Sequence, residues 1–496
     1  MATQNDSGRT GPPAGTDASA GPTGRKSRRR LVKVIIVFAL IAVVLPVAVF
    51  YIGSYIDAAR AGNPFEIARK AGIPVSFADP FYQKWGDARP ISAEENAAIY
   101  YEEAFAILPR ILDAATRGKL PMVGDLEMPD DPRVAFEPDT VAAMREFVQA
   151  NAKVLDLLHK GAGVPECYFS IYWSGFATNL PHLKDSRQAA RVLAVKMCAD
   201  IEDGTPHEAV QSALDGLALG KALTNEPTLI CGLTGLAIDS IVLGTGTERL
   251  LSRTDPPNED LATLQAAFSK AAEELSFRAA FIGEVAFQQD FYDRLRSGQP
   301  TVGPGGAGQS PLLKPFLLLG GPYITANQKR GLRLMLELID AVTNPTPENM
   351  SDAHWVAWQG QGSSKRYVFC RMMVPGLSRA IGQCEMTRAR LRAAAASCAA
   401  MRYRNDTGKW PESLETLVPA YLDKAPLDPF TGKPLLYKVD EKGITVYSVG
   451  RNQIDEGGKP YLVPRPPDVR PSVWDKYDDA GFRVWKAAEP PSGKGE

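Results

Sequence analysis

The sequence contains 496 residues with a formal net charge of −1, and 45% of its residues are hydrophobic while 23% are charged. This length and balance are typical of a folded chain with two or three domains. A nucleic-acid-binding protein usually has a basic domain, and this chain has none outside a short segment near its start, so we expect no nucleic-acid partner. The four histidines are too far apart in sequence to suggest a local metal site.

An apolar stretch, residues 31–56, lies near the start of the chain. Its central part, Val34–Ile56, contains no ionisable acid or base. As a helix this part would be about 34 Å long, which is enough to cross a hydrocarbon layer of about 30 Å. Unpaired backbone amides are costly in that layer, so the segment must be helical. We therefore predict one transmembrane helix, through which the protein contacts membrane lipid.

The residues on either side of the span predict its orientation. Residues 1–30 form a leader that is rich in small and polar residues and ends in the basic cluster Arg25–Arg30. We expect this leader to be disordered and to hold its side of the span on the cytoplasmic face of the cell inner membrane. The bulk of the chain would then be extracytoplasmic, in the periplasm. A cleaved signal peptide is the alternative, but the apolar run is longer than the usual signal core.

The middle of the chain is predicted to be helical. Residues 57–90 contain four prolines and are expected to form a linker, and residues 91–375 are expected to form a helical domain. Its segments have apolar residues at three- and four-residue steps and short connections, a pattern that favours antiparallel helix pairs and hints at a helical repeat. Each of four predicted helices begins at a capping or helix-starting residue: Asp185, Thr205, Glu226 and Asn258.

Six cysteines are scattered along the chain without a C-x-x-C pair. Outside the cytoplasm they could form disulfides. The simpler interpretation is that they are buried free thiols, which pack as small hydrophobic side chains.

The end of the chain has a different pattern. An alanine-rich helix is predicted from about Leu377 to Arg404, and two short strands, Leu435–Val439 and Ile444–Val449, are predicted to form a hairpin. Between and around them is an ordered series of local features: Tyr403-Arg404, Gly408-Lys409-Trp410-Pro411, Leu414, Leu417, Asp428-Pro429-Phe430, Gly432-Lys433-Pro434, Tyr437 and Val446-Tyr447-Ser448-Val449-Gly450.

This series resembles the C-terminal domain of the major pseudopilin of type II secretion systems. The resemblance covers about the last 110 residues and implies a small α+β domain over 376–488, followed by a disordered tail at 489–496. The layout of the whole chain also resembles uncharacterised membrane-anchored bacterial proteins. Unlike a pseudopilin, however, the chain has no glutamate in its apolar span, and roughly 320 residues separate the span from this domain.

The same resemblance implies a metal site. Members of that family hold a calcium ion in the loop after the strand, which would place Asp455 near the ion, with Asp478 and Asp479 as partners. Calcium prefers six to eight oxygen ligands, which such a loop can supply. The alternative is a solvated acidic turn, because Asn452-Gln453 interrupts the loop and a run of prolines lengthens it.

The helical region has few residues that suggest catalysis. Four acids lie in apolar helical contexts, and His182 lies beside Asp185 and Arg187. Two inward-facing carboxylates could act as acid and base, but ion pairs and helix caps are the commoner roles. The aromatic run 168–176 could line a ligand groove, although such runs more often pack between helices. The four acids are Asp239, Glu226, Glu273 and Glu284.

We therefore expect a mainly α-helical, single-pass membrane protein whose outer region acts as a scaffold or binding protein, with an unidentified protein partner in the cell envelope. Two alternatives stay open. One is a component of a type II secretion-like or envelope-assembly system that docks through its last domain. The other is a hydrolase whose site lies around Glu226, Glu284 and His182.

Overall fold

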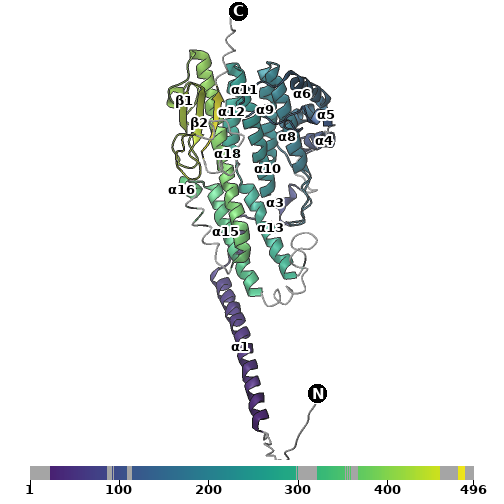
Figure 1. Cartoon of the computed structure of the whole chain (residues 1–496), viewed down its shortest axis with the longest axis vertical. Helices are drawn as coiled ribbons and strands as arrows, with labels where there is room; N and C mark the ends of the chain where they lie inside the picture. Colours follow the sequence, from purple (N-terminus) through teal and green to yellow (C-terminus); the bar gives the residue numbers. More distant parts are fainter. Residues whose placement is uncertain are drawn as a thin grey trace, which may run out of the picture.

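The structure of the protein, a computed structural model, describes residues 23–85, 92, 94–108, 114–297, 299, 321–351, 354, 356, 358, 367–458 and 479–485. It is mainly helical, with a small antiparallel sheet near the C-terminus, as predicted. One long helix projects from a compact body (Figure 1). The predicted disordered leader is wrong at residues 23–30, which form the first turns of a long helix. The rest of the leader, and the whole predicted tail, lie outside the described residues.

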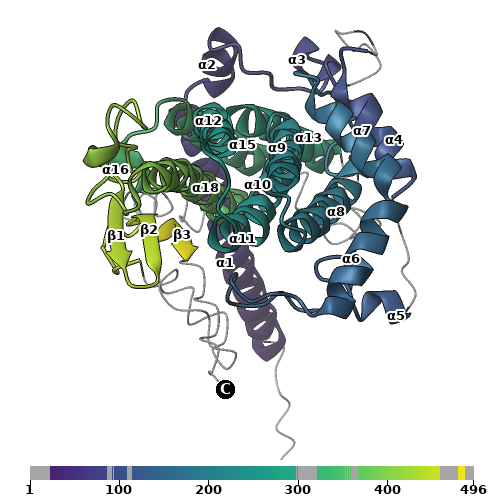
Figure 2. The same ribbon diagram turned by 90° about the horizontal axis from the view of Figure 1, so that it is seen from above.

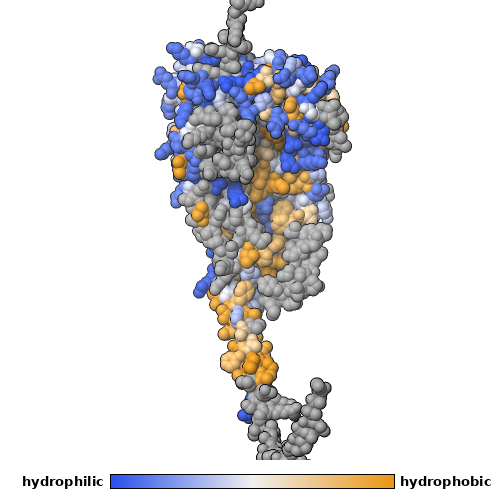
Figure 3. All heavy atoms as spheres, viewed as in Figure 1, coloured by the Kyte–Doolittle hydropathy of each residue, from blue (hydrophilic) through white to orange (hydrophobic). Residues whose placement is uncertain are grey.

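The projecting helix is α1, Thr23–Arg60, and it contains the predicted span together with Pro46. Its apolar window is not buried against any other described part of the chain, and its side chains from Val34 to Ile56 are largely exposed. Figure 3 shows this helix as an apolar rod below a more hydrophilic body. Exposing this apolar surface to water costs a free energy of roughly 25 cal/mol for each Å². Its length and apolar character therefore suit a hydrocarbon layer.

The described residues contain a second helical run long and apolar enough to cross a membrane, Leu229–Arg253. More than half of its window is buried in the body, and it carries Asp239 and Glu248. It packs against helices on several sides, so we treat it as a core helix of the body.

The end of α1 is joined to the body through α15, Gly321–Thr343. The Lys329 ammonium donates a 3.0 Å hydrogen bond to the carbonyl of Ala58, and the Arg333 guanidinium donates one of 2.6 Å to the carbonyl of Ala61. Cations are favourable at a helix C-terminus, where carbonyl groups lack partners. The two basic side chains therefore fix the direction in which α1 leaves the body.

Residues 57–85, in the predicted linker, pack on the body. They contain α2, Pro64–Lys70, and α3, Pro80–Gln83. Tyr82 is fully buried, and its hydroxyl donates a 3.0 Å hydrogen bond to the carbonyl of Gly283. This stretch is therefore a strap along the helices, and it limits how far the body can swing on α1.

The body contains two hydrophobic clusters. In Figure 2 the helices α4 to α7 lie on one side of the central helices, and the sheet lies on the other. The remaining helices of the body have the following bounds: α4 Ala97–Ala106, α5 Ala114–Arg117, α6 Pro138–Ala150, α7 Ala152–Ala162, α8 His182–Glu202, α9 Pro206–Thr224, α10 Leu229–Ser240, the π-helix η1 Ile241–Thr247, α11 Glu248–Arg253, α12 Asn258–Glu274, α13 Arg278–Ser297 and α16 Pro347–Met350.

Three local predictions in this region are wrong. The helix expected to start at Asp185 begins at His182, so Asp185 lies within its first turn. The long helix expected to start at Asn258 is two helices, α12 and α13, because the chain turns at residues 275–277. Glu226 does not start a helix: it lies in the loop before α10, and the Thr228 hydroxyl caps that helix by accepting a hydrogen bond from the backbone N–H of Cys231.

The C-terminal helix α18, Val368–Thr407, packs on α12 and also on the sheet. The predicted hairpin is confirmed as β1, Leu436–Asp440, and β2, Gly443–Ser448. A third strand that was not predicted, β3, Ala480–Trp485, pairs antiparallel with β2. A 3-10 turn, η3, Glu415–Leu417, precedes the sheet. One hydrophobic cluster contains residues from α12, α15, α18 and this sheet. The predicted boundary at 375–376 therefore does not separate two cores.

The buried carboxylate of Asp428 holds the loop between α18 and the sheet. It accepts hydrogen bonds from the backbone N–H of Phe430 at 2.8 Å, from the Ser448 hydroxyl at 2.9 Å and from the backbone N–H of Val449 at 3.1 Å. One side chain therefore ties the Asp-Pro-Phe turn to the end of β2, which explains why an aspartate lies there.

We expect Asp428→Ala to destabilise the full-length protein by about 3 kcal/mol, because it leaves buried donors without an acceptor. Urea unfolding in detergent, followed by circular dichroism, measures the change. The matched control is Asp423→Ala, which removes an exposed carboxylate from the same loop and should change stability by less than about 0.5 kcal/mol. Equal effects of the two substitutions would contradict this role for Asp428.

Candidate functional site

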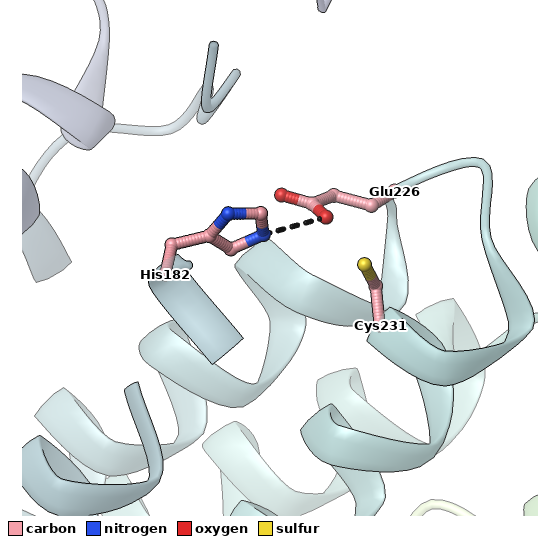
Figure 4. Close-up of side chains that lie close together, drawn as sticks. All are labelled: His182, Glu226 and Cys231. Atoms are coloured by element: carbon pink, nitrogen blue, oxygen red, sulfur yellow. Dashed lines mark hydrogen bonds and ion pairs between the residues drawn. The ribbon is translucent and has the colours of Figure 1, made fainter. Parts of the chain in front are cut away.

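A cluster of three buried side chains lies where α8, α9 and α10 meet. His182 is the first residue of α8, Glu226 lies in the loop between α9 and α10, and Cys231 lies in the first turn of α10. Figure 4 shows the three side chains pointing toward one another. The cluster therefore joins segments that are 44 residues apart in sequence.

The geometry of this His182–Glu226–Cys231 cluster is tight. The His182 Nε2 atom lies 3.0 Å from the Glu226 Oε2 atom, and one nitrogen, oxygen or sulfur atom from each residue lies within 4.8 Å of the others. Glu226 and Cys231 have no exposed surface, and His182 is 6% exposed. The ring of Phe169 stacks on the imidazole with 4.5 Å between centroids, which fixes the plane of that ring.

The other carboxylate oxygen of Glu226, Oε1, is buried and has no hydrogen-bond partner among the described residues. A buried polar atom without a partner costs about 1–3 kcal/mol, and more when it is charged. Folded proteins rarely leave such an atom unsatisfied. The cluster therefore lacks one hydrogen-bond donor or cation for the Oε1 atom of Glu226.

The environment of Cys231 does not favour a nucleophile. Burial raises the pKa of the Cys231 thiol well above its usual value, and the nearby Glu226 carboxylate raises it further. The thiol is therefore protonated at neutral pH, whereas thiol chemistry requires the thiolate. The imidazole nitrogen that could act as a base is already bonded to Glu226.

Glu284, the third member of the predicted hydrolase set, lies next to this cluster. Its Oε1 atom accepts a 2.9 Å hydrogen bond from the backbone N–H of Leu229, at the start of α10. Burial raises the pKa of the Glu284 carboxyl. Glu284 also lines a cavity of about 200 Å³ together with Gln288 and Met335. The structure thus gathers all three residues around the start of α10, but only His182 and Glu226 touch.

The other predicted acids are separate from this cluster. Glu273 is exposed on α12. Asp239 is buried on α10, where it shares the charge of Arg390 with Glu248. Burial of the carboxyl raises the pKa of Asp239 to about 7. Two buried carboxyls that share one guanidinium form an internal charge cluster rather than an open acid–base pair.

The aromatic run 168–176 mostly packs against other parts of the body. Trp173 stacks on Phe77 and donates a hydrogen bond to the carbonyl of Tyr82, so it holds the strap. Phe176 packs on Phe287 while keeping 45% of its surface exposed. Tyr172 is an exception, because 86% of its surface is exposed. Phe176 also lines the cavity of about 200 Å³ that contains Glu284, so a ligand site along this run stays a prediction.

Two of the three predicted calcium ligands lie in one loop region, and Asp478 lies outside the described residues. The Asp455 carboxylate accepts hydrogen bonds from the Tyr447 hydroxyl at 3.0 Å and from the backbone N–H of Gly457 at 2.8 Å. The Asp479 carboxylate accepts one from the backbone N–H of Gly458 at 2.7 Å. Both carboxylates thus face the turn before the third strand, and calcium binding there stays a prediction.

Sequence reasoning found His182 and Glu226 but missed Cys231. No spacing rule links a histidine to residues 44 and 49 positions later, so the sequence carries no motif for this cluster. The available signal is local: a glutamate and a cysteine lie five residues apart on either side of a helix-capping threonine.

No protein-family model matches the chain, and no match was found among curated proteins or among solved structures. The class of the protein is therefore defined by its own fold: a mainly helical body joined to one exposed apolar helix.

We expect the stability of the protein to fall as the pH rises from about 4 to about 7, in part because of Asp239. The folded protein keeps a proton on this carboxyl up to about pH 7, whereas the unfolded chain releases it near pH 4. Asp239→Asn removes this difference. The variant should match the wild type at pH 4.5 and melt at a higher temperature at pH 8.

The melting temperatures of the wild type and the variant are measured by thermal unfolding of the full-length protein in detergent across this pH range. The control is Glu273→Gln, which removes an exposed carboxylate and should leave the wild-type pH profile unchanged. An Asp239→Asn profile parallel to that of the wild type would rule out this contribution.

Proposed function

We propose that this protein is a single-pass inner-membrane protein that presents a scaffold or binding body in the periplasm. The observation that carries this is the surface of α1, whose apolar window has no covering from the described body. The basic cluster Arg25–Arg30 and the scarcity of basic residues after the span support a cytoplasmic N-terminus. The bonds from Lys329 and Arg333 to the end of α1 support a body held close to the membrane surface.

A groove on the body supports a binding role. It has a volume of about 350 Å³ and lies between the end of α7, α9 and α12. Its floor is rich in alanine, including Ala218, Ala222 and Ala267. Small residues of this kind allow the backbone of another protein segment to approach closely. The Lys221–Glu274 ion pair, with 2.8 Å between its charged atoms, lies at the rim and could orient such a segment.

Hydrolysis is less well supported by the same structure. His182 and Glu226 are buried and bonded to each other, and Glu284 is bonded to the backbone of α10. A catalytic base must reach a substrate atom at about 2.6–3.2 Å, and these groups are occupied by one another or by the fold.

The C-terminal sheet favours one more specific version of the proposal. The packing of a long helix, α18, on a three-stranded antiparallel sheet agrees with the α+β unit that the pseudopilin resemblance implies. In this version the body docks on pseudopilin-like proteins of a type II secretion-like or envelope-assembly system. The shared core of α18 and α12 means that the sheet would act as part of the body and not as a separate module.

Membrane topology can be measured with two single cysteine substitutions. We expect Glu441→Cys, in the exposed hairpin turn, to react with a membrane-impermeant maleimide in cells whose outer membrane is permeabilised. Ser7→Cys, in the leader, should react only after the inner membrane is lysed. The wild type gives the background from Cys167, which is partly exposed. The opposite labelling pattern would place the body in the cytoplasm.

The groove can be tested with a photo-crosslinking amino acid in living cells. We expect a crosslinker at Lys270, which is exposed in the groove, to give a discrete adduct. A crosslinker at Lys184, which is exposed at the start of α8, should not give that adduct. Mass spectrometry of the adduct then tests the docking version, which predicts a pseudopilin-like partner. The same weak, diffuse adducts at both positions would contradict a binding role for the groove.

A further inference from the structure

We propose that His182, Glu226 and Cys231 bind one zinc ion that fastens the helical body internally. The three residues offer an imidazole nitrogen, carboxylate oxygens and a sulfur, which are the ligand types that zinc takes in proteins. Zinc is borderline in softness, so it suits this mixed set better than calcium or magnesium, which prefer oxygen alone. This zinc site is independent of the membrane anchor and of the groove.

The positions of the atoms suit a tetrahedral ion. Zinc lies about 2.0–2.2 Å from nitrogen and oxygen ligands and about 2.3 Å from sulfur, so neighbouring ligand atoms are about 3.3–3.7 Å apart. In the structure, the three ligand atoms lie within 4.8 Å of one another, and His182 Nε2 and Glu226 Oε2 are 3.0 Å apart. The three ligand atoms are therefore already gathered at close to the spacing that the ion needs.

The unpartnered Oε1 atom of Glu226 is the second and independent observation. It is buried within this cluster and bonds to none of the described residues. A carboxylate that binds the ion through both oxygens would satisfy this atom. With the imidazole nitrogen and the sulfur, the ion would then have four protein donor atoms in a distorted tetrahedron, because the two oxygens of one carboxylate lie closer together than ideal tetrahedral positions.

The surroundings hold the ligands in place before an ion arrives. Phe169 stacks on the His182 ring. The backbone N–H of Glu226 donates to the carbonyl of Leu223 at 3.1 Å, and the N–H of Thr228 donates to the carbonyl of Glu226 at 2.9 Å, so the Glu226 turn is fixed at both ends. Zinc would bind the Cys231 sulfur as a thiolate, with release of the thiol proton to solvent.

The role of the ion would be structural. Because the ligand residues are 0–6% exposed, a substrate has no direct access to the metal. The ion would cross-link the start of α8 to the loop before α10 and to α10 itself. Leu183, beside His182, and Cys231 both belong to the same hydrophobic cluster, so the metal would reinforce the packing of α8 on α10 within that cluster.

Metal content of the full-length protein tests the site. The protein is purified in detergent with a tag that lacks histidine and is dialysed against zinc-free buffer. We expect it to retain about one zinc per chain, as measured by inductively coupled plasma mass spectrometry. The variants His182→Gln, Glu226→Gln and Cys231→Ser should retain less than about one-tenth of that amount. The matched controls Cys198→Ser, at another buried cysteine, and His207→Gln, at an exposed histidine, should keep the wild-type amount.

A wild-type protein without zinc, or cluster variants that keep the wild-type zinc content, would overturn the inference. If the variants do not fold, cobalt substitution of the wild-type protein still tests whether the cysteine binds the metal. After exchange of zinc for Co²⁺, the protein should show a thiolate-to-cobalt charge-transfer band and the intense visible bands of a tetrahedral ion. If stoichiometric cobalt gives neither band, cysteine ligation is excluded. Addition of a chelator should also lower the melting temperature of the wild type, and an unchanged melting temperature would exclude a structural role.

Discussion

The rest of the structure depends on the exposed apolar surface of α1. A helix with this much uncovered hydrocarbon is stable only where water is absent, and a hydrocarbon layer also requires every backbone amide in it to be bonded within the helix. In the membrane topology that we propose, that constraint divides the chain into a leader and a body on opposite sides. At the end of this helix, the Lys329 and Arg333 side chains donate hydrogen bonds to the carbonyls of Ala58 and Ala61 and satisfy them there.

The joint between α1 and α15 has consequences for the body. The strap formed by α2 and α3 runs along the helices, and the buried Tyr82 hydroxyl bonds to the backbone of α13. The body is thus fastened to its anchor at more than one place, unlike a domain on a flexible tether. On the opposite side, α18 contributes to the same core as α12 and carries the sheet. A partner that binds the sheet or the groove would therefore act on a body whose orientation to α1 is fixed.

Local patterns in the sequence predicted local structure well. The hairpin of β1 and β2 follows from two alternating runs around a short turn, and the apolar face of α18, with Cys384 and Cys398, follows from the helical period. The break at residues 275–277 was missed because apolar periodicity continues across it. The strand β3 was missed because a long segment separates it from β2, and its pairing is set by contacts distant in sequence.

The candidate site also depends on contacts between residues distant in sequence, which local patterns cannot predict. Sequence reasoning selected His182, Glu226 and Glu284 as isolated residues in apolar helices, but it could not show that they meet around the start of α10. Cys231 was counted only as one of six scattered thiols, and none of the six forms a disulfide in the structure. Tertiary packing alone brings α8 to the α9–α10 loop, so the cluster could not be found from spacing.

The most direct measurement of the central claim is a pair of reporter fusions after Glu496. Alkaline phosphatase folds to an active enzyme only outside the cytoplasm, and green fluorescent protein exported by the general secretion route fluoresces only inside it. An anchored body in the periplasm predicts an active phosphatase fusion and a dark fluorescent fusion, both in the membrane fraction. A fluorescent fusion with an inactive phosphatase fusion would contradict the account.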